Sequence, residues 1–290
     1  MALPLPRSLS PSSVSSFKDC GLAFRFSYVE RLPEPPSVPA SRGTLVHRAL
    51  ELLMTREPAE RSRSAAYADL ATAVEELRDH PEFVGLGLSE SEWAGFTDEA
   101  TELVDKYFEL EDPSTVHPIG IELKMQADLG DGVVVRGIID RLELDADGEL
   151  VVTDYKTGRM PPERFEKQRL EGVHVYALLC QEMLGRRPAR VQLLYLTDPA
   201  AIIATPTERS VAGVARKNRA VWEAVRTACL RDDFRPNPGK HCDWCSFRDY
   251  CPAFGGDPDR AVELRIVAEE NEAIAAGAPP LFTTSGASAT

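Results

Sequence analysis

The fold is decided by two strings, Gly137-Ile138-Ile139-Asp140 and Asp154-Tyr155-Lys156-Thr157-Gly158. Each string lies in or ends a run rich in Val, Ile and Leu, residues 133–144 and 150–155, and this composition is typical of β-strands. A turn sequence, Asp145-Ala146-Asp147-Gly148, separates the two runs. The pattern therefore predicts an antiparallel β-hairpin with acidic residues on both strands.

The predicted turn determines which residues of the hairpin face each other. If residues 146–148 form a three-residue loop with Gly148 in the left-handed conformation, Asp140 lies opposite Asp154. Lys156 is two residues beyond Asp154, so both side chains project from the same face of the strand. Two carboxylates and one ammonium group are therefore expected to meet at one place.

Such a cluster has two interpretations. It can be a solvated strand edge with a surface ion pair. It can also be a metal site, because charges that interrupt apolar runs are costly unless they are paired or bind a metal. Two carboxylates that lie close together favour a divalent cation, and Lys156 is placed to polarise a water or a phosphoryl oxygen beside it. Gly137 and Gly158 would let a large ligand approach closely.

The two strings, in this order on a predicted hairpin, resemble the RecB-family branch of the PD-(D/E)XK nuclease superfamily. The resemblance implies an α/β fold with a restriction-endonuclease-like core, in which helices flank a mixed sheet. It implies metal ligands at His47, in the string Gly43-Thr44-Leu45-Val46-His47, and at Asp140, Asp154 and the carbonyl of Tyr155. It assigns catalytic roles to Asp140, Asp154 and Lys156.

Two further residues complete the expected site. Tyr176 matches the tyrosine of the family's Q-x-x-x-Y string, but Gly172 stands where the glutamine is expected, and Gln168 or His174 could substitute for it. Glu122 lies on the polar face of residues 119–129, where apolar residues alternate with polar ones. We predict Glu122 as a further metal ligand, with a solvated strand position as the alternative.

The order of elements agrees with such a core. Helices are predicted over residues 8–20, 42–54, 64–110 with a break near 85–87, 162–184, 210–230 and 258–276. Strands are predicted over residues 119–129, 133–144, 150–155, 190–197 and 201–205. We expect one nuclease domain over residues 1–254 with a helical insertion at about 55–115, followed by a C-terminal helix and a disordered tail over 255–290. No phosphate-binding loop of a helicase is present, so a helicase motor would lie on another chain.

The charge of the chain constrains how it could bind DNA. Lys and Arg number 33 and Asp and Glu 46, which gives a net charge of −13. Since phosphate contacts come from Lys and Arg, DNA binding requires a local basic surface. For any single basic residue a solvated helix face is the favoured interpretation, and the candidates for a local basic surface are Arg159, Arg164, Lys167, Arg169, Arg216, Lys217 and Arg219. Neither a secretory signal nor a membrane span is evident, so a cytoplasmic protein without membrane contact is expected.

The cysteines predict a second metal site. Cys242, Cys245 and Cys251 lie within ten residues, and Cys20 is the natural fourth ligand because it follows a helix end. Cys180 and Cys229 lie in amphipathic helical runs, where buried free cysteines are common. Spacing alone permits zinc or an iron–sulfur cluster. Zinc held by the three C-terminal cysteines and His241 is the alternative without Cys20.

The string from Cys242 to Pro252, with one N-terminal cysteine, is similar to that of iron–sulfur RecB-family nucleases. These include CRISPR-associated adaptation nucleases and nuclease subunits of recombinational repair complexes. The resemblance implies a 4Fe-4S cluster that joins the two ends of the domain.

We therefore expect a Mg²⁺- or Mn²⁺-dependent DNA nuclease, an exonuclease on single-stranded DNA or duplex ends. Its pathway would be DNA repair, recombination or CRISPR adaptation, with a separate helicase or another repair or CRISPR protein as partner. One alternative is a non-catalytic DNA-binding or scaffold subunit. Another is a zinc-stapled α/β protein without a role on nucleic acid.

Overall fold

The computed structural model describes residues 2–162 and 166–265, with the backbone alone for 166–171. The chain forms two compact units. The sheet unit comprises residues 7–15 and 35–224, and the cysteine unit comprises the described residues among 1–6, 16–34 and 225–290. The prediction of one nuclease domain over residues 1–254 is not tested by this division and stays a prediction.

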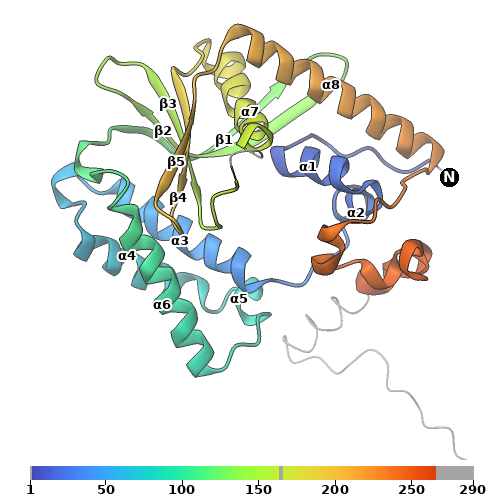
Figure 1. Ribbon diagram of the computed structural model, residues 1–290, viewed down its shortest axis with the longest axis horizontal. Coiled ribbons are helices and arrows are strands. Elements are labelled where there is room, and N and C mark those ends of the chain that lie inside the picture. The colour runs from blue at the N-terminus through green and yellow to red at the C-terminus, as the bar shows by residue number, and fades with distance from the viewer. Residues whose placement is uncertain (1, 163–165, 266–290) are drawn as a thin grey trace, which may run out of the picture. The chain divides into compact units, whose positions relative to one another are not determined.

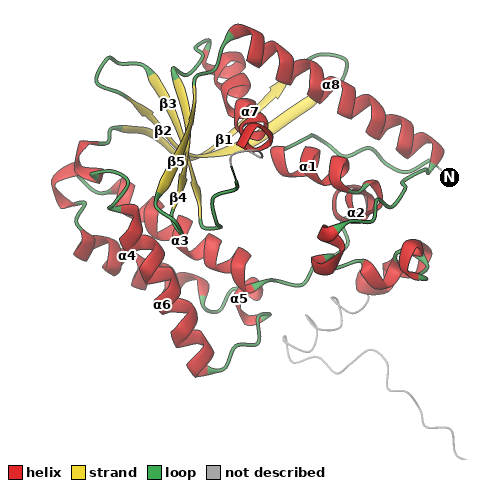
Figure 2. Cartoon of the chain, viewed as in Figure 1, coloured by secondary structure: helices red, strands yellow, loops and turns green. Residues whose placement is uncertain are grey.

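The sheet unit is built on one mixed five-stranded sheet (Figure 1). The strands follow the spatial order β1-β2-β3-β4-β5, and only β3 and β4 are parallel. Their bounds are β1 Pro118–Asp128, β2 Val134–Leu144, β3 Leu150–Lys156, β4 Arg190–Tyr195 and β5 Ala200–Ala204. The predicted mixed α/β architecture, a sheet flanked by helices, is confirmed (Figure 2).

The hairpin between β2 and β3 has the predicted loop. Leu144 pairs with Leu150, and the backbone N–H of Asp145 donates to the carbonyl of Glu149 at 3.0 Å. Three residues therefore close the loop, and Gly148 adopts φ 74°, as the left-handed position requires. The pairing continues to Arg141 opposite Thr153, so Asp140 and Asp154 are next in register.

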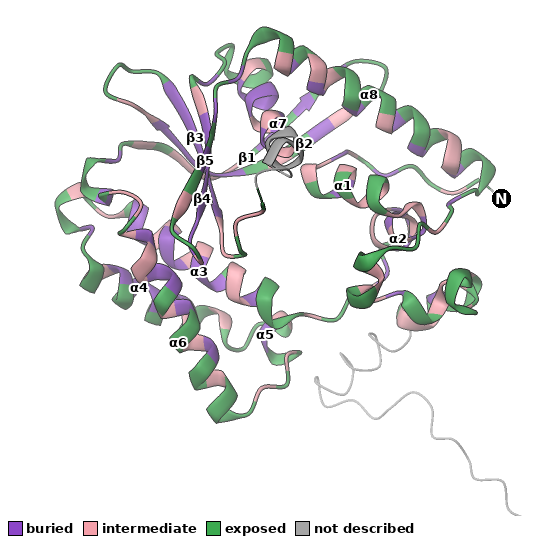
Figure 3. Ribbon diagram, in the orientation of Figure 1, coloured by how far each residue is buried: buried purple, intermediate pink, exposed green. Residues whose placement is uncertain are grey.

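Helices pack on the sheet and form two hydrophobic cores with it. Val152 of β3 and Leu193 of β4 lie in a core shared with α7 (Glu166–Leu184). Tyr155 and Leu194, of opposite parity on the same strands, lie in a core shared with α3 (Val38–Thr55). Because strand side chains alternate between faces, the two cores occupy opposite faces of the sheet. Figure 3 shows the resulting burial of β3 and β4.

The helical insertion lies on the α3 face. It consists of α4 (Arg63–Leu77), the short α5 (Pro81–Val84) and α6 (Glu90–Tyr107). α6 begins with a capping box between Ser89 and Glu92, and the predicted break near residues 85–87 is confirmed. α3 begins four residues earlier than predicted, since Pro39 in its first turn is compatible with a helix start.

The remaining helices are α1 (Pro11–Asp19), α2 (Gly21–Phe24) and α8 (Glu208–Arg231). Val211, Val214 and Trp222 of α8 pack in the α7 core. Helix α7 agrees with the prediction from residue 166 onward, and residues 163–165 lie outside the described part of the chain.

The cysteine unit has a small apolar core of its own, made by Leu22, Phe26, Leu32, Phe247 and Ala261. A π-helix at Arg25–Glu30 precedes short 3-10 turns at Lys240–Trp244, Arg248–Tyr250, Pro252–Phe254 and Pro258–Val262. The predicted helix at 258–276 begins with the last of these turns, and its remainder from 266, with the tail, lies outside the described residues. Across the described residues, every helix is too short or too polar to cross a membrane.

Candidate metal centre

Strands β1 and β2 change faces at the site. Leu123 pairs with Ile139, and both pack in the α7 core, whereas Ile121 packs in the α3 core. Residues two apart on a regular strand share a face, so the strand reverses between Ile121 and Leu123. The predicted regular alternation over residues 119–129, which would place Ile121 and Leu123 on one face, is therefore wrong. The physical reason is Glu122, whose left-handed backbone with φ 46° breaks the alternation beside Asp140.

His47 reaches the site from helix α3. Its Nδ1 lies 3.5 Å from Oδ2 of Asp140, and its Nε2 donates to the carbonyl oxygen of Tyr155 at 3.1 Å. Gly43, one turn earlier, allows the segment after β3 to approach, since a Cβ at this position would lie 3.1 Å from Oγ1 of Thr157. Helix α3 and the end of β3 therefore meet at Gly43 and His47.

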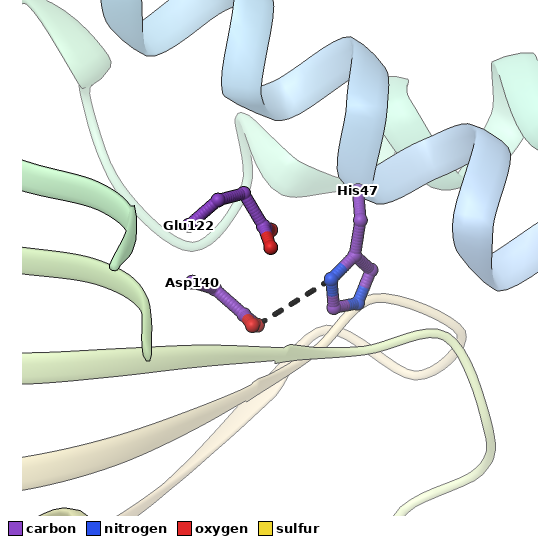
Figure 4. Close-up of side chains that lie close together, drawn as sticks. All are labelled: His47, Glu122 and Asp140. Carbon is purple, nitrogen blue, oxygen red and sulfur yellow. Dashed lines mark ion pairs between the residues drawn. The ribbon is translucent and has the colours of Figure 1, made fainter. Parts of the chain in front are cut away.

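Three residues can offer metal ligands to one point. One ligand atom from each of His47, Glu122 and Asp140 lies within 4.8 Å of the others, and no other such group occurs among the residues that the structure describes. Figure 4 shows the three side chains directed at a common space from α3, β1 and β2. Two carboxylates and one imidazole fit a divalent cation such as Mn²⁺ or Mg²⁺.

The remaining predicted residues lie beside this group. Asp154 is 3% exposed, its Oδ2 forms an ion pair with Nζ of Lys156, and its Oδ1 accepts a hydrogen bond from the hydroxyl of Tyr176 at 3.2 Å. The backbone N–H of Tyr155 donates to Oδ2 of Asp140 at 2.7 Å. The fold therefore brings the predicted residues together, with the Asp154 carboxylate held by Lys156 and Tyr176.

Burial disfavours the charged forms of Asp140, Glu122 and His47. Burial and the nearby Asp154 carboxylate raise the pKa of Asp140 well above its usual value. Burial, with Glu51 and Asp154, raises the pKa of Glu122, and burial lowers the pKa of His47. For Lys156, burial opposes the charge, but the contact with Asp154 outweighs it and the pKa is raised. A cation at this point would stabilise the charged carboxylates.

A buried arginine network beneath the site was missed by sequence reasoning. Arg141 is fully buried, and its Nη1 donates to the hydroxyl of Tyr155 at 2.7 Å. Its Nη2 donates to Oε2 of Glu111 at 2.9 Å, and its Nε forms an ion pair with Glu143 at 2.7 Å. The network holds the ring of Tyr155, whose backbone contacts His47 and Asp140. A charge directly after Asp140 in an apolar run is the signal that could have identified it.

Two glycines differ from expectation. Gly137 does not admit a ligand: a Cβ there would lie 3.0 Å from Cε1 of Tyr176, so Gly137 lets α7 pack on β2. At Gly172, a Cβ would meet nothing within 4 Å, so the side chain of a glutamine would have room to begin there. Of the predicted substitutes, His174 is half-buried, and the side chain of Gln168 lies outside the described residues.

The four predicted cysteines, all among the described residues, line one pocket of the cysteine unit, but no three of their sulfur atoms lie within 4.8 Å of one another. Cys20, Cys242, Cys245 and Cys251 share this pocket with apolar residues such as Leu22 and Phe26. Burial, with the three neighbouring thiols, raises the pKa of Cys245. The other two cysteines, Cys180 and Cys229, are buried and free, as expected. His241 lines the same pocket, so the zinc alternative stays open.

The predicted basic residues differ in their surroundings. Arg159, Arg216 and Lys217 are exposed. Arg219 donates to the carbonyl of Leu129 at 2.6 Å and so connects α8 to the turn after β1. The side chains of three others, Arg164, Lys167 and Arg169, lie outside the described part of the chain.

Comparison with known proteins agrees with the geometry. The sequence pattern of the PD-(D/E)XK nuclease superfamily matches residues 8–252. The Gene 69 protein of Mycobacterium phage D29 is 24% identical over 287 residues, which cover 84% of this chain and 96% of that protein. A solved structure from Eubacterium rectale, provisionally named an exonuclease, has a TM-score of 0.53 over 82% of this chain and 87% of its own. At 11% identity, that structure supports the fold alone.

A shorter similarity concerns a much larger protein. An ATP-dependent helicase/nuclease subunit of Pelotomaculum thermopropionicum is 37% identical over 73 residues. These residues are 24% of this chain and only 6% of the relative.

Proposed function

The chain belongs to the PD-(D/E)XK nuclease superfamily, and from this premise we propose that it is a metal-dependent deoxyribonuclease. One observation carries the proposal. His47, Glu122 and Asp140 offer ligand atoms within 4.8 Å of one another, directly beside the ion pair of Asp154 and Lys156. A divalent cation held by these ligands and the ammonium group of Lys156 beside it can both stabilise the negative charge that develops on the phosphate during phosphodiester hydrolysis.

The cation is Mg²⁺ or Mn²⁺, and the imidazole of His47 favours Mn²⁺. His47, Glu122, Asp140, Asp154 and the carbonyl oxygen of Tyr155 would hold it. When bound, the cation polarises the scissile phosphate and lowers the pKa of a water molecule.

The protein's own side chains orient the reacting groups. The ion pair with Asp154 positions Nζ of Lys156 beside the metal ligands. There the ammonium group offsets the negative charge that develops on the phosphate. The hydroxyl of Tyr176 fixes the other oxygen of Asp154. Arg141, through the ring of Tyr155, holds the backbone segment to which Asp140 and His47 are hydrogen-bonded.

We propose DNA ends or single strands as the substrate, cut as an exonuclease in repair, recombination or CRISPR adaptation. The short similarity to a helicase/nuclease subunit supports a partnership with a helicase on a separate chain. Among the alternatives, a non-catalytic DNA-binding subunit would keep the fold, and Gly172 in place of a glutamine is the feature that favours it.

The four cysteines are proposed to hold a 4Fe-4S cluster. The support is their position around one pocket, together with apolar neighbours such as Leu22 and Phe26 that exclude water. Zinc bound by three cysteines and His241 is the alternative. Anaerobically purified protein should be brown with stoichiometric iron and sulfide, whereas a colourless protein with one zinc would support the alternative.

The test of the enzyme is cleavage of end-labelled single-stranded and duplex DNA in Mn²⁺ and in Mg²⁺. Lys156→Ala should reduce the cleavage rate by about a hundredfold to a thousandfold, as loss of one group that stabilises the transition state does. Its melting temperature and iron content should equal those of the wild type. Arg187→Ala, an exposed cation at the opposite end of the sheet, is the control and should cut normally.

Two results would contradict the proposed nuclease activity. If iron-replete wild type cuts no form of DNA in Mn²⁺ but binds it, the non-catalytic subunit is the correct description. If it neither binds nor cuts DNA, the protein has no nucleic-acid role of the kind proposed.

A further inference from the structure

The hairpin of β1 and β2 extends beyond the metal centre and exposes one face. Lys124 and Gln126 of β1 and Arg136 and Ile138 of β2 are all exposed. Lys124 pairs directly with Ile138, and Gln126 with Arg136, so the four side chains form one compact patch, here called the hairpin face. Residues of the other parity, such as Met125, are buried against α7.

The hairpin face adjoins the metal centre. Ile138 lies two residues before Asp140, which is about 7 Å along a strand. Lys124 lies two residues after Glu122 and interacts electrostatically with its carboxylate. A ligand that lies on this face therefore continues into the group formed by His47, Glu122 and Asp140.

The cations on this face are available for a ligand. Within the part of the chain that the structure describes, neither Lys124 nor Arg136 has an ion-pair partner, while Arg48 of α3, Arg56 directly after it and Arg63 of α4 are each paired with a carboxylate. Asp128, the next polar residue on this side of β1, accepts a hydrogen bond from the backbone N–H of Gly130 at 2.8 Å. This hydrogen bond stabilises the turn between β1 and β2. On a chain of net charge −13, two unpaired cations next to a cluster of carboxylates form a local basic surface.

Ile138 adds an apolar surface between the cations. It is 45% exposed in the middle of a strand, whereas Val135 and Ile139, on the other face of β2, are fully buried. Cations combined with an apolar surface suit a nucleic-acid strand, whose phosphates need positive charge and whose bases or sugars need apolar contact when unpaired.

We infer that the hairpin face binds a single DNA strand and leads it to the metal centre. In this arrangement Lys124 and Arg136 contact phosphates, Gln126 contacts the backbone, and Ile138 packs against a base or sugar. The inference rests on the proposed nuclease function and adds to it the path of the substrate and the residues that bind it.

The test measures binding without cleavage. Affinity of the complete protein for a fluorescent single-stranded oligonucleotide is determined by anisotropy in EDTA over a series of salt concentrations. The double variant Lys124→Ala/Arg136→Ala should weaken binding at least tenfold at low salt. It should also reduce the slope of log K against log[salt] by about 1.4, since each phosphate contact contributes about 0.7 for single strands.

Two further variants separate charge from apolar contact. The variant Arg187→Ala/Arg209→Ala removes the same charge from exposed positions after α7 and at the start of α8, at the opposite end of the sheet, and should keep the wild-type slope. Ile138→Ala should weaken binding without changing the slope. Melting temperature and Mn²⁺ affinity verify that each variant is folded, and Lys124→Gln/Arg136→Gln replaces the alanine pair if it is not.

The outcomes distinguish this inference from the proposed function. If the hairpin-face variant binds with wild-type affinity and slope while the wild type cuts DNA, the inference is overturned and the nuclease proposal stands. If both double variants lose affinity and slope equally, the effect is one of net charge and the inference is also overturned. If the wild type neither binds nor cuts DNA, both fail together.

Discussion

Asp140 must satisfy two opposing demands. Its carboxylate accepts a hydrogen bond from the backbone of Tyr155, which supports the charged form. Burial and Asp154 oppose that charge and raise its pKa. The protein therefore retains, at its centre, a carboxylate that is costly to ionise until a cation is bound.

This cost predicts how Asp140→Asn changes stability. The pKa of Asp140 is raised in the folded state, so its favourable contribution is complete below the unfolded pKa and is lost as the pH rises through the folded pKa. In EDTA, Asp140→Asn should therefore increase the free energy of unfolding at pH 7.5, by about 1.4 kcal/mol for each unit of pKa elevation. The increase should shrink towards pH 4.

Urea unfolding at several pH values measures this difference. The asparagine oxygen can still accept from Tyr155, so the hydrogen bond is retained as an internal control. A variant that is less stable than wild type at pH 7.5 would contradict the expected cost of ionisation. Cleavage should be lost in either case.

At the scale of the element, β1 departs from regular strand geometry at Glu122. The left-handed backbone of Glu122 costs about 1–2 kcal/mol for a residue with a Cβ. The reversal moves Ile121 into the α3 core and Leu123 into the α7 core, and it directs Glu122 towards His47. The strain therefore places a carboxylate in the metal centre.

Replacing Glu122 with glycine and with alanine isolates this strain. Both variants remove the carboxylate, but only glycine relieves the backbone. We expect Glu122→Gly to be about 1 kcal/mol more stable than Glu122→Ala in thermal unfolding without metal. In a regular strand alanine is the more stable residue, so the opposite order would show that no strain exists. Both variants should bind Mn²⁺ more weakly in titration.

A second element-scale prediction concerns Glu111, which follows α6. Its two oxygens bind the guanidinium of Arg141, so Glu111→Ala leaves a fully buried cation with one partner fewer. Breaking a buried ion pair in this way destabilises proteins by about 3–5 kcal/mol. Urea unfolding should show a loss of this size. Glu109→Ala, at an exposed neighbouring position, should change stability by less than about 0.5 kcal/mol.

For the whole molecule, the cysteine pocket joins segments more than 200 residues apart in the sequence. If the four cysteines hold a cluster, Cys20→Ala should lower iron content and melting temperature together, because closing so long a loop requires the metal. Cys180→Ala, which removes a buried thiol from the α7 core, should lower the melting temperature while iron is retained. Equal iron content in Cys20→Ala and the wild type would remove Cys20 from the ligand set.

The net charge of the whole molecule also affects how it would associate with DNA. The net charge of −13 predicts slow association with DNA at low salt unless basic residues are concentrated locally. The hairpin face is such a concentration, and it lies next to the carboxylates that contribute to the negative charge.

The sequence by itself determined the features that depend on neighbouring residues. The three-residue loop, the shared face of Asp154 and Lys156, and the helices of the insertion follow from turn chemistry and periodicity, which act over a few residues. Gly43 and His47 could be paired with the hairpin only through resemblance to a family, since α3 and β3 are far apart in the chain.

Only the tertiary structure decided what depends on several elements at once. The reversal at Glu122 arises because β1 must serve two cores on opposite faces, and no local pattern encodes that requirement. The partners of Arg141 come from the segment after α6 and from β2 and β3. The exposure of Ile138 depends on where the α3 core ends on the face of the sheet opposite α7. Packing between distant segments determines each of these, and together they convert a hairpin with two carboxylates into a site that can hold a cation.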